Sequence, residues 1–234
     1  MQARMGSSRL PGKILMEAGG KTFLEHAFQR LSLAGNIDQC VVATTTDERD
    51  DVVVDFCSRH GWPCSRGPEN DVLTRYYQTA IRFPSDIIVR VTADCPLLDP
   101  SLINQVVELL AADFPGTAYA SNTLDPRHFP RGLDVEAFTS AALEEAYQGA
   151  REPFDREHVT PFLRERPEQF PRRALSIEDD YSSHRWTLDT PEDQRLLSRI
   201  LEHLPDPEPW EKILSLIEDN PEWSKLNATI RQKA

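Results

Sequence analysis

The sequence predicts an α/β protein with three layers, in which helices cover both faces of a mixed, mostly parallel β-sheet. Two observations carry this prediction. Short apolar, β-branched runs at 39–44 and 86–92 are typical of strands that are buried on both faces. Amphipathic stretches alternate with them, as the crossover helices between parallel strands require. The 234 residues suffice for a single domain over 1–234, because they contain no linker and no internal repeat.

Local signals set the expected bounds of the individual elements. The first helix is expected over 21–33, with Thr22 as its cap and Glu25 at the spacing of a capping box. Helices are also predicted over 47–60, 71–82, 100–112, 139–148, 155–165, 191–203 and 208–219. Short strands are predicted at 63–65, 117–121, 133–138, 172–177 and 185–188. We expect residues 220–234 to form a tail on the surface.

The composition argues against several classes of function. Lys and Arg number 26 and Asp and Glu number 38, which gives a formal net charge of −12. Such a chain lacks the positive charge with which proteins bind nucleic acids or anionic membranes, so we expect neither partner. No apolar run approaches the roughly 20 residues of a membrane span, and the first thirteen residues lack the apolar part of a secretory signal. The four cysteines form no CxxC pair, which favours reduced thiols in a cytoplasmic protein.

The segment 2–13, QARMGSSRLPGK, carries the strongest local signal for a binding site. It contains Arg4, Arg9 and Lys13 but no acidic residue, in a chain that is acidic overall. Its glycines and serines allow backbone N–H groups to approach an oxyanion, while the cations neutralise phosphate charge. This pattern favours a loop that binds a triphosphate, although it is not the GxxxxGK[ST] motif of P-loop enzymes. The alternative is a solvated basic segment.

Two aspartates stand where predicted strands end, at the edge of a parallel sheet where ligands bind. Asp94 follows the second apolar run, and Asp189 follows the last predicted strand. Asp99 is expected to cap the next helix, and Thr190 with Asp193 has the spacing of a second capping box, which leaves the two strand-end aspartates for another role. Mg²⁺ prefers one or two carboxylates together with phosphate oxygens, so these residues predict a site for Mg²⁺ and a nucleotide. The alternative is that Asp94 only caps a helix.

Together these segments resemble the cytidylyltransferases that activate sugar acids. Within that family the sequence is most similar to the spore-coat polysaccharide biosynthesis protein F type. Proteins of that type are homologous to CMP-KDO synthetase and resemble acylneuraminate cytidylyltransferases. The similarity reaches to about Leu201. It continues through RGPENDVLTRY (66–76), RVTADCPLLDP (90–100), RGLDVE (131–136), REHVTP (156–161) and RWTLDTPEDQR (185–195).

The resemblance implies a nucleotide-diphospho-sugar transferase fold, which is GT-A-like and Rossmann-like. It also implies transfer of CMP from CTP to a sugar or sugar acid with release of pyrophosphate, Mg²⁺ as cofactor, and a homodimer. The implied catalytic residues are Arg4, Arg9, Lys13 and Asp94, and the implied metal ligands are Asp94 and Asp189. Contacts to the nucleotide are implied for the three cations and for Ala3, Gly6, Ser7, Ser8, Gly67, Asp71, Arg75 and Thr92. Contacts to the acceptor sugar are implied for Arg131, Asp134, Glu136, His158 and His184, each of which has a structural alternative.

Two other functions stay open on the sequence alone. The first is the same fold with another nucleotide or with the reaction of a GT-A glycosyltransferase, although Asp94-Cys95-Pro96 does not supply the DxD motif of that class. The second is a truncated, non-catalytic homologue. Family members have a short apolar strand before the QAR motif, whereas this chain starts at Met1-Gln2. We therefore expect a phosphate loop without an anchoring strand and exposed sheet edges beside it.

Overall fold

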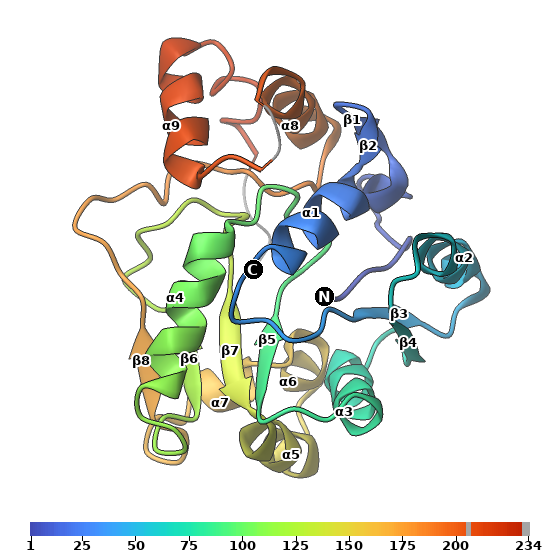
Figure 1. The fold of residues 1–234 in the computed structure, drawn as a ribbon, viewed down its shortest axis with the longest axis vertical. Helices are drawn as coiled ribbons and strands as arrows, with labels where there is room; N and C mark the ends of the chain where they lie inside the picture. Colours follow the sequence, from blue (N-terminus) through green and yellow to red (C-terminus); the bar gives the residue numbers. More distant parts are fainter. Residues whose placement is uncertain (205–206, 231–234) are drawn as a thin grey trace.

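A mixed β-sheet forms the centre of the molecule (Figure 1). The computed structural model describes residues 1–204 and 207–230. The main strands are β3 (Val42–Thr45), β4 (Cys64–Gly67), β5 (Ile87–Arg90), β6 (Tyr119–Ser121), β7 (Glu136–Thr139) and β8 (Arg172–Ala174). Across the sheet the order is β4, β3, the first three residues, β5, β7, β6 and β8. Strand β7 is antiparallel to both neighbours and the other pairs are parallel, which confirms the predicted α/β class with its mixed sheet.

The first three residues lie between β3 and β5 in this sheet. On one side, the N–H of Gln2 donates to the Val91 carbonyl over 3.0 Å, and the Gln2 carbonyl accepts from the N–H of Ala93 over 2.9 Å. On the other side, backbone groups of Met1 and Ala3 pair with β3 at 2.8 and 3.2 Å. This corrects the expectation of a phosphate loop without an anchor, because three residues suffice to pair with both neighbouring strands.

Helices cover both faces of the sheet. One face carries α1 (Phe23–Ser32), α2 (Asp51–His60) and α4 (Pro100–Ala111), and the other carries α3 (Val72–Arg82), α5 (Ser140–Gly149), α6 (Pro153–His158) and α7 (Pro161–Arg164). The side chains of β7 alternate between the two resulting cores, because Ala137 packs with the first set of helices and Phe138 with the second. The three layers that the sequence predicts are therefore present.

The C-terminal helices build a third hydrophobic cluster at the top of the view in Figure 1. They are α8 (Pro191–His203) and α9 (Trp210–Asp219), and α8 packs against the hairpin of β1 (Glu17–Ala18) and β2 (Lys21–Thr22). The chain after α9 differs from the expected surface tail, because Trp223 is buried in this cluster and Asn227 is only 4% exposed. The end of that predicted tail, 231–234, lies outside the described residues.

The helix caps agree with the sequence patterns. Thr22 and Glu25 form the predicted capping box of α1, and Thr190 and Asp193 form that of α8. The Asp99 carboxylate caps α4 by accepting two backbone N–H groups of its first turn. Because these side chains satisfy backbone donors that have no partner within the helix, the start of each helix is fixed by its own sequence.

The helix predicted over 155–165 is two short helices instead of one. Val159 separates α6 from α7 with φ 71° and ψ −57°, and the N–H of Thr160 donates to the His158 carbonyl over 2.8 Å. This is a strained γ-turn, because β-branched residues rarely adopt a positive φ. Pro161 then occupies the first turn of α7.

The strand predicted at 185–188 is not formed. One isolated bridge joins Arg185 to Arg131, and the N–H of Leu188 donates to the Asp94 carbonyl over 2.8 Å. The partners of this segment lie in loops, so no regular ladder develops. The segment nevertheless places Asp189 beside the loop after β5.

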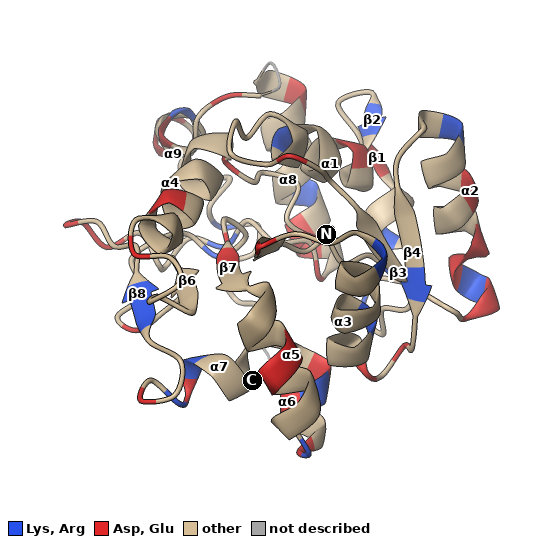
Figure 2. Ribbon diagram, turned by 60° about the horizontal axis from the view of Figure 1, so that its bottom comes forward, with Lys and Arg blue, Asp and Glu red and all other residues tan. Residues whose placement is uncertain are grey.

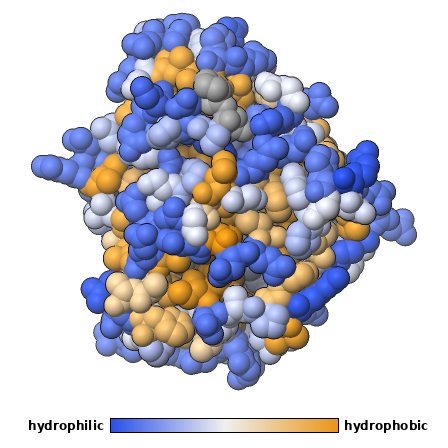
Figure 3. All heavy atoms as spheres, in the orientation of Figure 1, coloured by the Kyte–Doolittle hydropathy of each residue, from blue (hydrophilic) through white to orange (hydrophobic). Residues whose placement is uncertain are grey.

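Charged residues are spread widely over the molecule. Figure 2 shows basic and acidic residues distributed over helices and loops on several sides of the molecule. On the face in Figure 3, hydrophobic residues reach the surface in patches between hydrophilic ones. The exposed large hydrophobic residues are Leu33, Val52, Ile81, Phe114 and Phe154. Within the described residues, no helix combines the length and the apolar character that crossing a membrane would need.

Gly132 provides a test of the close packing against the backbone of Trp186. It has φ 104°, and a Cβ atom there would lie 2.5 Å from the backbone carbonyl of Trp186. We expect Gly132→Ala to lower the free energy of unfolding, measured in urea, by roughly 2–4 kcal/mol, because positive φ and a clash with backbone act together. The control is Gly20→Ala, which has φ 82° but open space around the new Cβ atom and should lose about 1 kcal/mol. Equal losses in the two variants would contradict the role of the Trp186 contact.

Candidate functional site

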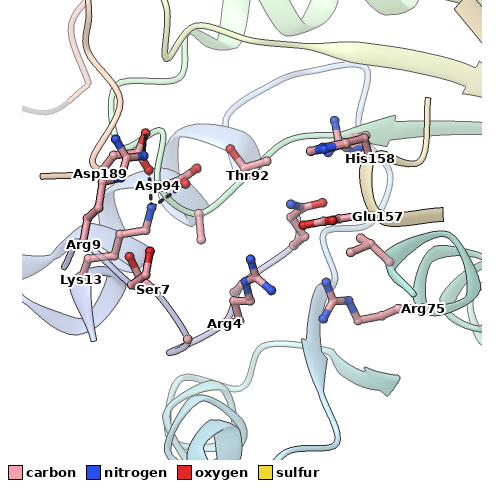
Figure 4. Close-up of a pocket in the computed structure, with 17 residues that line it drawn as sticks. Arg4, Ser7, Arg9, Lys13, Arg75, Thr92, Asp94, Glu157, His158 and Asp189 are labelled. Atoms are coloured by element: carbon pink, nitrogen blue, oxygen red, sulfur yellow. Dashed lines mark hydrogen bonds and ion pairs between the residues drawn. The ribbon is translucent and has the colours of Figure 1, made fainter. Parts of the chain in front are cut away.

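A cavity of about 260 Å³ opens beside residues 2–13, at the ends of the central strands (Figure 4). Most of the residues predicted to bind a nucleotide or a metal line it: Ala3, Arg4, Gly6, Ser7, Ser8, Arg9, Lys13, Arg75, Thr92, Asp94 and Asp189. Of the residues predicted to bind the acceptor, His158 lines it. The sequence analysis missed five lining residues, which are Gln2, Val72, Arg90, Ala93 and Glu157. Each lies in or next to a segment that carries the family resemblance, which is the signal that identifies them.

The basic loop is folded by its own backbone and by a buried aspartate. The N–H of Met5 donates to Asp50 Oδ1 over 2.6 Å, and the N–H of Gly12 donates to the Met5 carbonyl over 3.1 Å. Within the loop, Ser7 Oγ accepts from the N–H of Leu10 over 3.3 Å. Asp50 is 2% exposed, so the loop is attached to the protein core rather than solvated as a free segment. This observation disfavours the alternative of a solvated basic tail.

The two strand-end aspartates meet at one lysine. Lys13 Nζ donates to Asp94 Oδ2 over 2.7 Å and to Asp189 Oδ1 over 2.8 Å, as the dashed lines in Figure 4 show. Burial alone would lower the pKa of Lys13, but the charges of Asp94 and Asp189 raise it above its ordinary value. Burial would raise the pKa of Asp189, yet the charge of Lys13 and hydrogen bonds from Lys13 and Arg185 lower it. Lys13 and Asp189 are therefore both charged near neutral pH.

The same carboxylates fit a divalent cation that arrives with a nucleotide. Oxygens of Asp94 and Asp189 converge on one cationic atom, which shows that the pair is arranged to hold positive charge between them. Among the residues that the structure describes, no group of three or more His, Cys, Asp and Glu side chains forms a site made by the protein alone. Two carboxylates that need phosphate oxygens and water to complete the coordination are what Mg²⁺ prefers.

A second positive region lies across the cavity from the carboxylates. Figure 4 shows Arg4 and Arg75 directed toward the same space. Arg75 is 2% exposed, and its Nε and Nη1 atoms have no hydrogen-bond partner in the described part of the chain. Burial lowers the pKa of the Arg75 guanidinium, and the nearby charge of Arg4 adds to this effect. Because unpaired buried cations are costly, an anionic ligand bound here would relieve both the charge and the unmade hydrogen bonds.

Two residues predicted to bind the nucleotide support residues that line the cavity. A Cβ atom at Gly67 would lie 2.9 Å from atoms of Arg75, so glycine allows this arginine to pack against β4. Asp71 caps α3 through the N–H of Thr74 and accepts from Arg156 Nη2 over 2.6 Å. Neither Gly67 nor Asp71 lines the cavity. Direct nucleotide contacts by these two residues stay a prediction.

Glu136 supports the cavity from the interior of the protein. It is 5% exposed and pairs with Arg90, while Glu136 Oε1 accepts from the hydroxyl groups of Tyr119 and Thr160 at 2.6 Å each. Burial would raise the pKa of Glu136, but the charge of Arg90 and the hydrogen bonds from these partners lower it. The pairing raises the pKa of Arg90 in turn, against the effect of burial. Glu136 thus holds Arg90, which lines the cavity, and does not line the cavity itself.

The other predicted acceptor residues lie outside the cavity lining. Asp134 pairs with Arg127, and the N–H of Arg131 donates to the His184 carbonyl over 3.0 Å. His184 lines a separate cavity of about 370 Å³ beneath the C-terminal segment, with Trp186 beside it. Acceptor contacts by Arg131, Asp134 and His184 stay predictions that the geometry of the main cavity does not support.

The buried pair of Glu136 and Arg90 predicts a pH dependence of stability. Because the pKa of Glu136 is lowered by folding, its contribution is present above the ordinary value of 4.5 and is lost as pH falls through the folded-state pKa. Glu136→Gln should lower the free energy of unfolding by about 3 kcal/mol at pH 7 and flatten its decline below pH 4.5, because Arg90 loses its ionised partner. Urea unfolding across this range, with the exposed Glu202→Gln as control, measures both effects. A profile in Glu136→Gln as steep as that of the control would contradict this assignment.

The chain is similar to solved structures of nucleotidyltransferases. A cytidylyltransferase from Leptospira borgpetersenii serovar Hardjo-bovis superimposes with a TM-score of 0.92 and 35% identity, over 99% of this chain and 97% of that one. CMP:2-keto-3-deoxy-manno-octonic acid synthetase, solved with CTP, superimposes with a TM-score of 0.66 and 18% identity, over 86% of this chain and 95% of that one, which shows a common fold. These likenesses confirm the predicted nucleotidyltransferase fold.

Relatives in sequence agree with this result. Uncharacterized protein MJ1063 of Methanocaldococcus jannaschii is 35% identical over 100% of this chain and 95% of its own length. The spore coat polysaccharide biosynthesis protein SpsF of Bacillus subtilis is 28% identical over 86% and 84%. A 3-deoxy-manno-octulosonate cytidylyltransferase of Geobacter metallireducens is 33% identical over 47% of this chain and 43% of its own length. The family model described as cytidylyltransferase matches residues 1–219, and the chain therefore belongs to the cytidylyltransferase family of nucleotidyltransferase enzymes.

Proposed function

We propose that this enzyme transfers CMP from CTP to a hydroxyl group of a sugar or sugar acid and releases pyrophosphate, to supply a CMP-sugar for surface polysaccharide or glycan synthesis. The observation that carries the proposal is the cluster in which Asp94 and Asp189 share Lys13, with Arg4 and Arg9 on the same loop. This cluster offers cations for the phosphates and a carboxylate pair for a metal ion. The names of the relatives support CTP as the nucleotide and a sugar acid as the acceptor.

The residues of the loop bind and orient the triphosphate in this proposal. Arg4, Arg9 and Lys13 contact phosphate oxygens, and backbone N–H groups of the loop add further donors. Lys13 would turn from its two carboxylates to phosphate oxygens, and Asp94 and Asp189 would hold Mg²⁺. When bound, Mg²⁺ neutralises the charge that develops on the phosphates. The acceptor oxygen bonds to the α-phosphorus while the bond from the α-phosphorus to the bridging oxygen of the pyrophosphate breaks, and the hydroxyl proton passes to solvent water.

The acceptor binds at the opposite end of the cavity in this proposal. Arg90, Glu157 and His158 line that end, and Figure 4 shows Glu157 and His158 on the side away from the carboxylate pair. Burial lowers the pKa of His158, so its imidazole is neutral near pH 7 and hydrogen-bonds without adding charge. Arg90 is then the residue that attracts a negatively charged group of the acceptor, because Glu136 fixes its guanidinium in place.

The alternative functions find less support. Asp94 is followed by Cys95 and Pro96, so the loop after β5 lacks the second aspartate of the DxD motif of GT-A glycosyltransferases. The non-catalytic alternative depended on a phosphate loop without an anchor, and the backbone bonds of the first three residues remove that reason. Homodimerisation and a cytoplasmic location stay predictions, and the consumption of CTP is the reason to place the reaction in the cytoplasm.

Release of pyrophosphate tests the proposed reaction directly. We expect CTP, Mg²⁺ and a panel of sugar acids that includes 3-deoxy-manno-octulosonate to give pyrophosphate and a CMP-sugar, measured by a coupled phosphate assay and mass spectrometry. Asp94→Asn and Asp189→Asn should each lower kcat at least about 100-fold, because each removes a carboxylate from the metal site.

Thermal unfolding is the control for these variants, which should keep a cooperative transition. Replacing CTP by ATP, GTP or UTP tests the nucleotide. A folded protein whose melting temperature does not respond to CTP with Mg²⁺ would contradict the proposal, as would full activity in either aspartate variant.

Variants at the two ends of the cavity should change the KM values of different substrates. Arg90→Gln should raise the KM for the acceptor roughly 10-fold or more with little effect on the KM for CTP, because the lost charge faces the acceptor. Arg9→Gln is the matched variant at the other end, where Arg9 lies 3.2 Å from Asp189, and it should raise the KM for CTP instead. Steady-state rates at varied concentrations of each substrate measure this pattern. A rise in the KM for CTP alone in Arg90→Gln would place Arg90 in the nucleotide site.

A further inference from the structure

A series of buried polar contacts links the C-terminal segment to Asp189. Arg185 Nη2 donates to Asp189 Oδ2 over 2.7 Å, and Arg185 Nε donates to Asp193 Oδ1 over 2.9 Å. Asn227 Nδ2 donates to the same oxygen of Asp193 over 2.8 Å and to the Arg185 carbonyl over 2.9 Å. Asn227 therefore contacts two residues of this series. One is Arg185, which binds the Asp189 carboxylate, and the other is Asp193, which binds Arg185.

Asp193 is the centre of this arrangement. It is fully buried, and its second oxygen accepts from the N–H of Asp189 at 3.0 Å, the N–H of Thr190 at 3.0 Å and Arg185 Nη2 at 3.1 Å. Asp193 thus fixes the backbone of Asp189 directly and its side chain through Arg185. Because a buried carboxylate is stable only with its partners in place, the orientation of Asp193 depends on the complete set of donors, Asn227 included.

The cations that contact Asp189 differ in what holds them. Arg9 and Lys13 belong to the basic loop and line the cavity, at 3.2 and 2.8 Å from Asp189 oxygens. Both turn to phosphate oxygens in the proposed reaction. Arg185 does not line that cavity, and its side chain is 7% exposed and bonded to Asp193. Arg185 is consequently the partner that stays on Asp189 when a nucleotide and a metal ion are bound.

The segment that carries Asn227 is itself fixed to the protein. Trp223 is 5% exposed and packs in the C-terminal hydrophobic cluster, with its ring 4.9 Å from that of His203 on α8. Asn227 is 4% exposed. The family match ends at residue 219, so this support for Asp189 comes from a part of the chain beyond the matched region.

We propose that Asn227 is a positioning residue for the metal carboxylate Asp189, acting through Asp193 and Arg185; this rests on the proposed function, in which Asp189 binds the metal ion. The amide of Asn227 keeps Asp193 in the orientation that aligns the Arg185 guanidinium. Arg185 in turn fixes Oδ2 of the Asp189 carboxylate, so the other oxygen, Oδ1, faces Lys13 Nζ. Partners behind a metal ligand tune metal affinity in this way because they set the direction of its lone pairs.

Calorimetric titration with CTP tests this inference without any acceptor. Each full-length protein is titrated with CTP in EDTA and again in Mn²⁺, and the ratio of the two Kd values gives the gain in affinity due to the metal. Asn227→Ala should reduce this gain severalfold. That is near or below the lower end of the roughly 10- to 100-fold losses of metal affinity that follow mutation of a residue hydrogen-bonded to a metal ligand. The Kd for CTP in EDTA should change little, because Asn227 does not line the nucleotide cavity.

Asn220→Ala is the matched control. The amide of Asn220 donates to the Leu216 carbonyl over 2.8 Å and has no contact with Asp193 or Arg185, so this variant loses a similar hydrogen bond in the same segment and should keep the full gain. Asn227→Ser retains a hydroxyl donor and a milder packing change. It should fall between the wild type and Asn227→Ala, and it keeps the test available if Asn227→Ala does not fold.

The outcomes separate the inference from the proposed function. If the wild type gains affinity from Mn²⁺ and the folded Asn227 variants keep that gain while their melting temperatures fall, Asn227 is only structural and the inference is wrong. If the wild type binds CTP but gains nothing from Mn²⁺, the assignment of Asp189 as a metal ligand fails first, and the inference fails with it. A reduced gain in the Asn227 variants, with a full gain in Asn220→Ala, supports it.

Discussion

The candidate site depends on two carboxylates that share one ammonium group. Lys13, Asp94 and Asp189 lie far apart in the sequence, with separations of 81 and 176 residues between the bonded pairs. Their contact requires the basic loop, the end of the central strand and the C-terminal half of the chain to be in place together. The shared lysine therefore couples folding to the assembly of the site, since none of these segments can bring the three charges together alone.

The positions that sequence predicts well are those governed by local chemistry. The caps at Thr22, Asp99 and Thr190 and the strand before Asp94 follow from short-range rules, and the structure confirms them, although the residues of that strand are only partly buried. The fold class follows from the same patterns. The pattern of cations, glycines and serines also predicts the basic loop, and Arg4, Arg9 and Lys13 of that loop line the cavity.

The sequence analysis fails where a side chain depends on distant partners. Arg90 is an arginine in an apolar strand, and its ionic partner Glu136 lies 46 residues away in the sequence. The sequence does not show this pairing, so it predicts Glu136 as a residue that contacts the acceptor and does not identify Arg90. Trp223 and Asn227 likewise follow a helix in a polar stretch, so nothing nearby indicates that they are buried. Similarly, no local rule predicts a positive φ at a β-branched residue such as Val159.

The γ-turn at Val159 lies between two parts of the candidate site. On its N-terminal side, Glu157 and His158 line the cavity, and on its C-terminal side Thr160 donates to Glu136 in the interior. The buried Val159 is therefore the one residue of the chain between the cavity lining and the hydroxyl group that binds the interior carboxylate, so the backbone geometry at this valine fixes the position of both groups relative to each other.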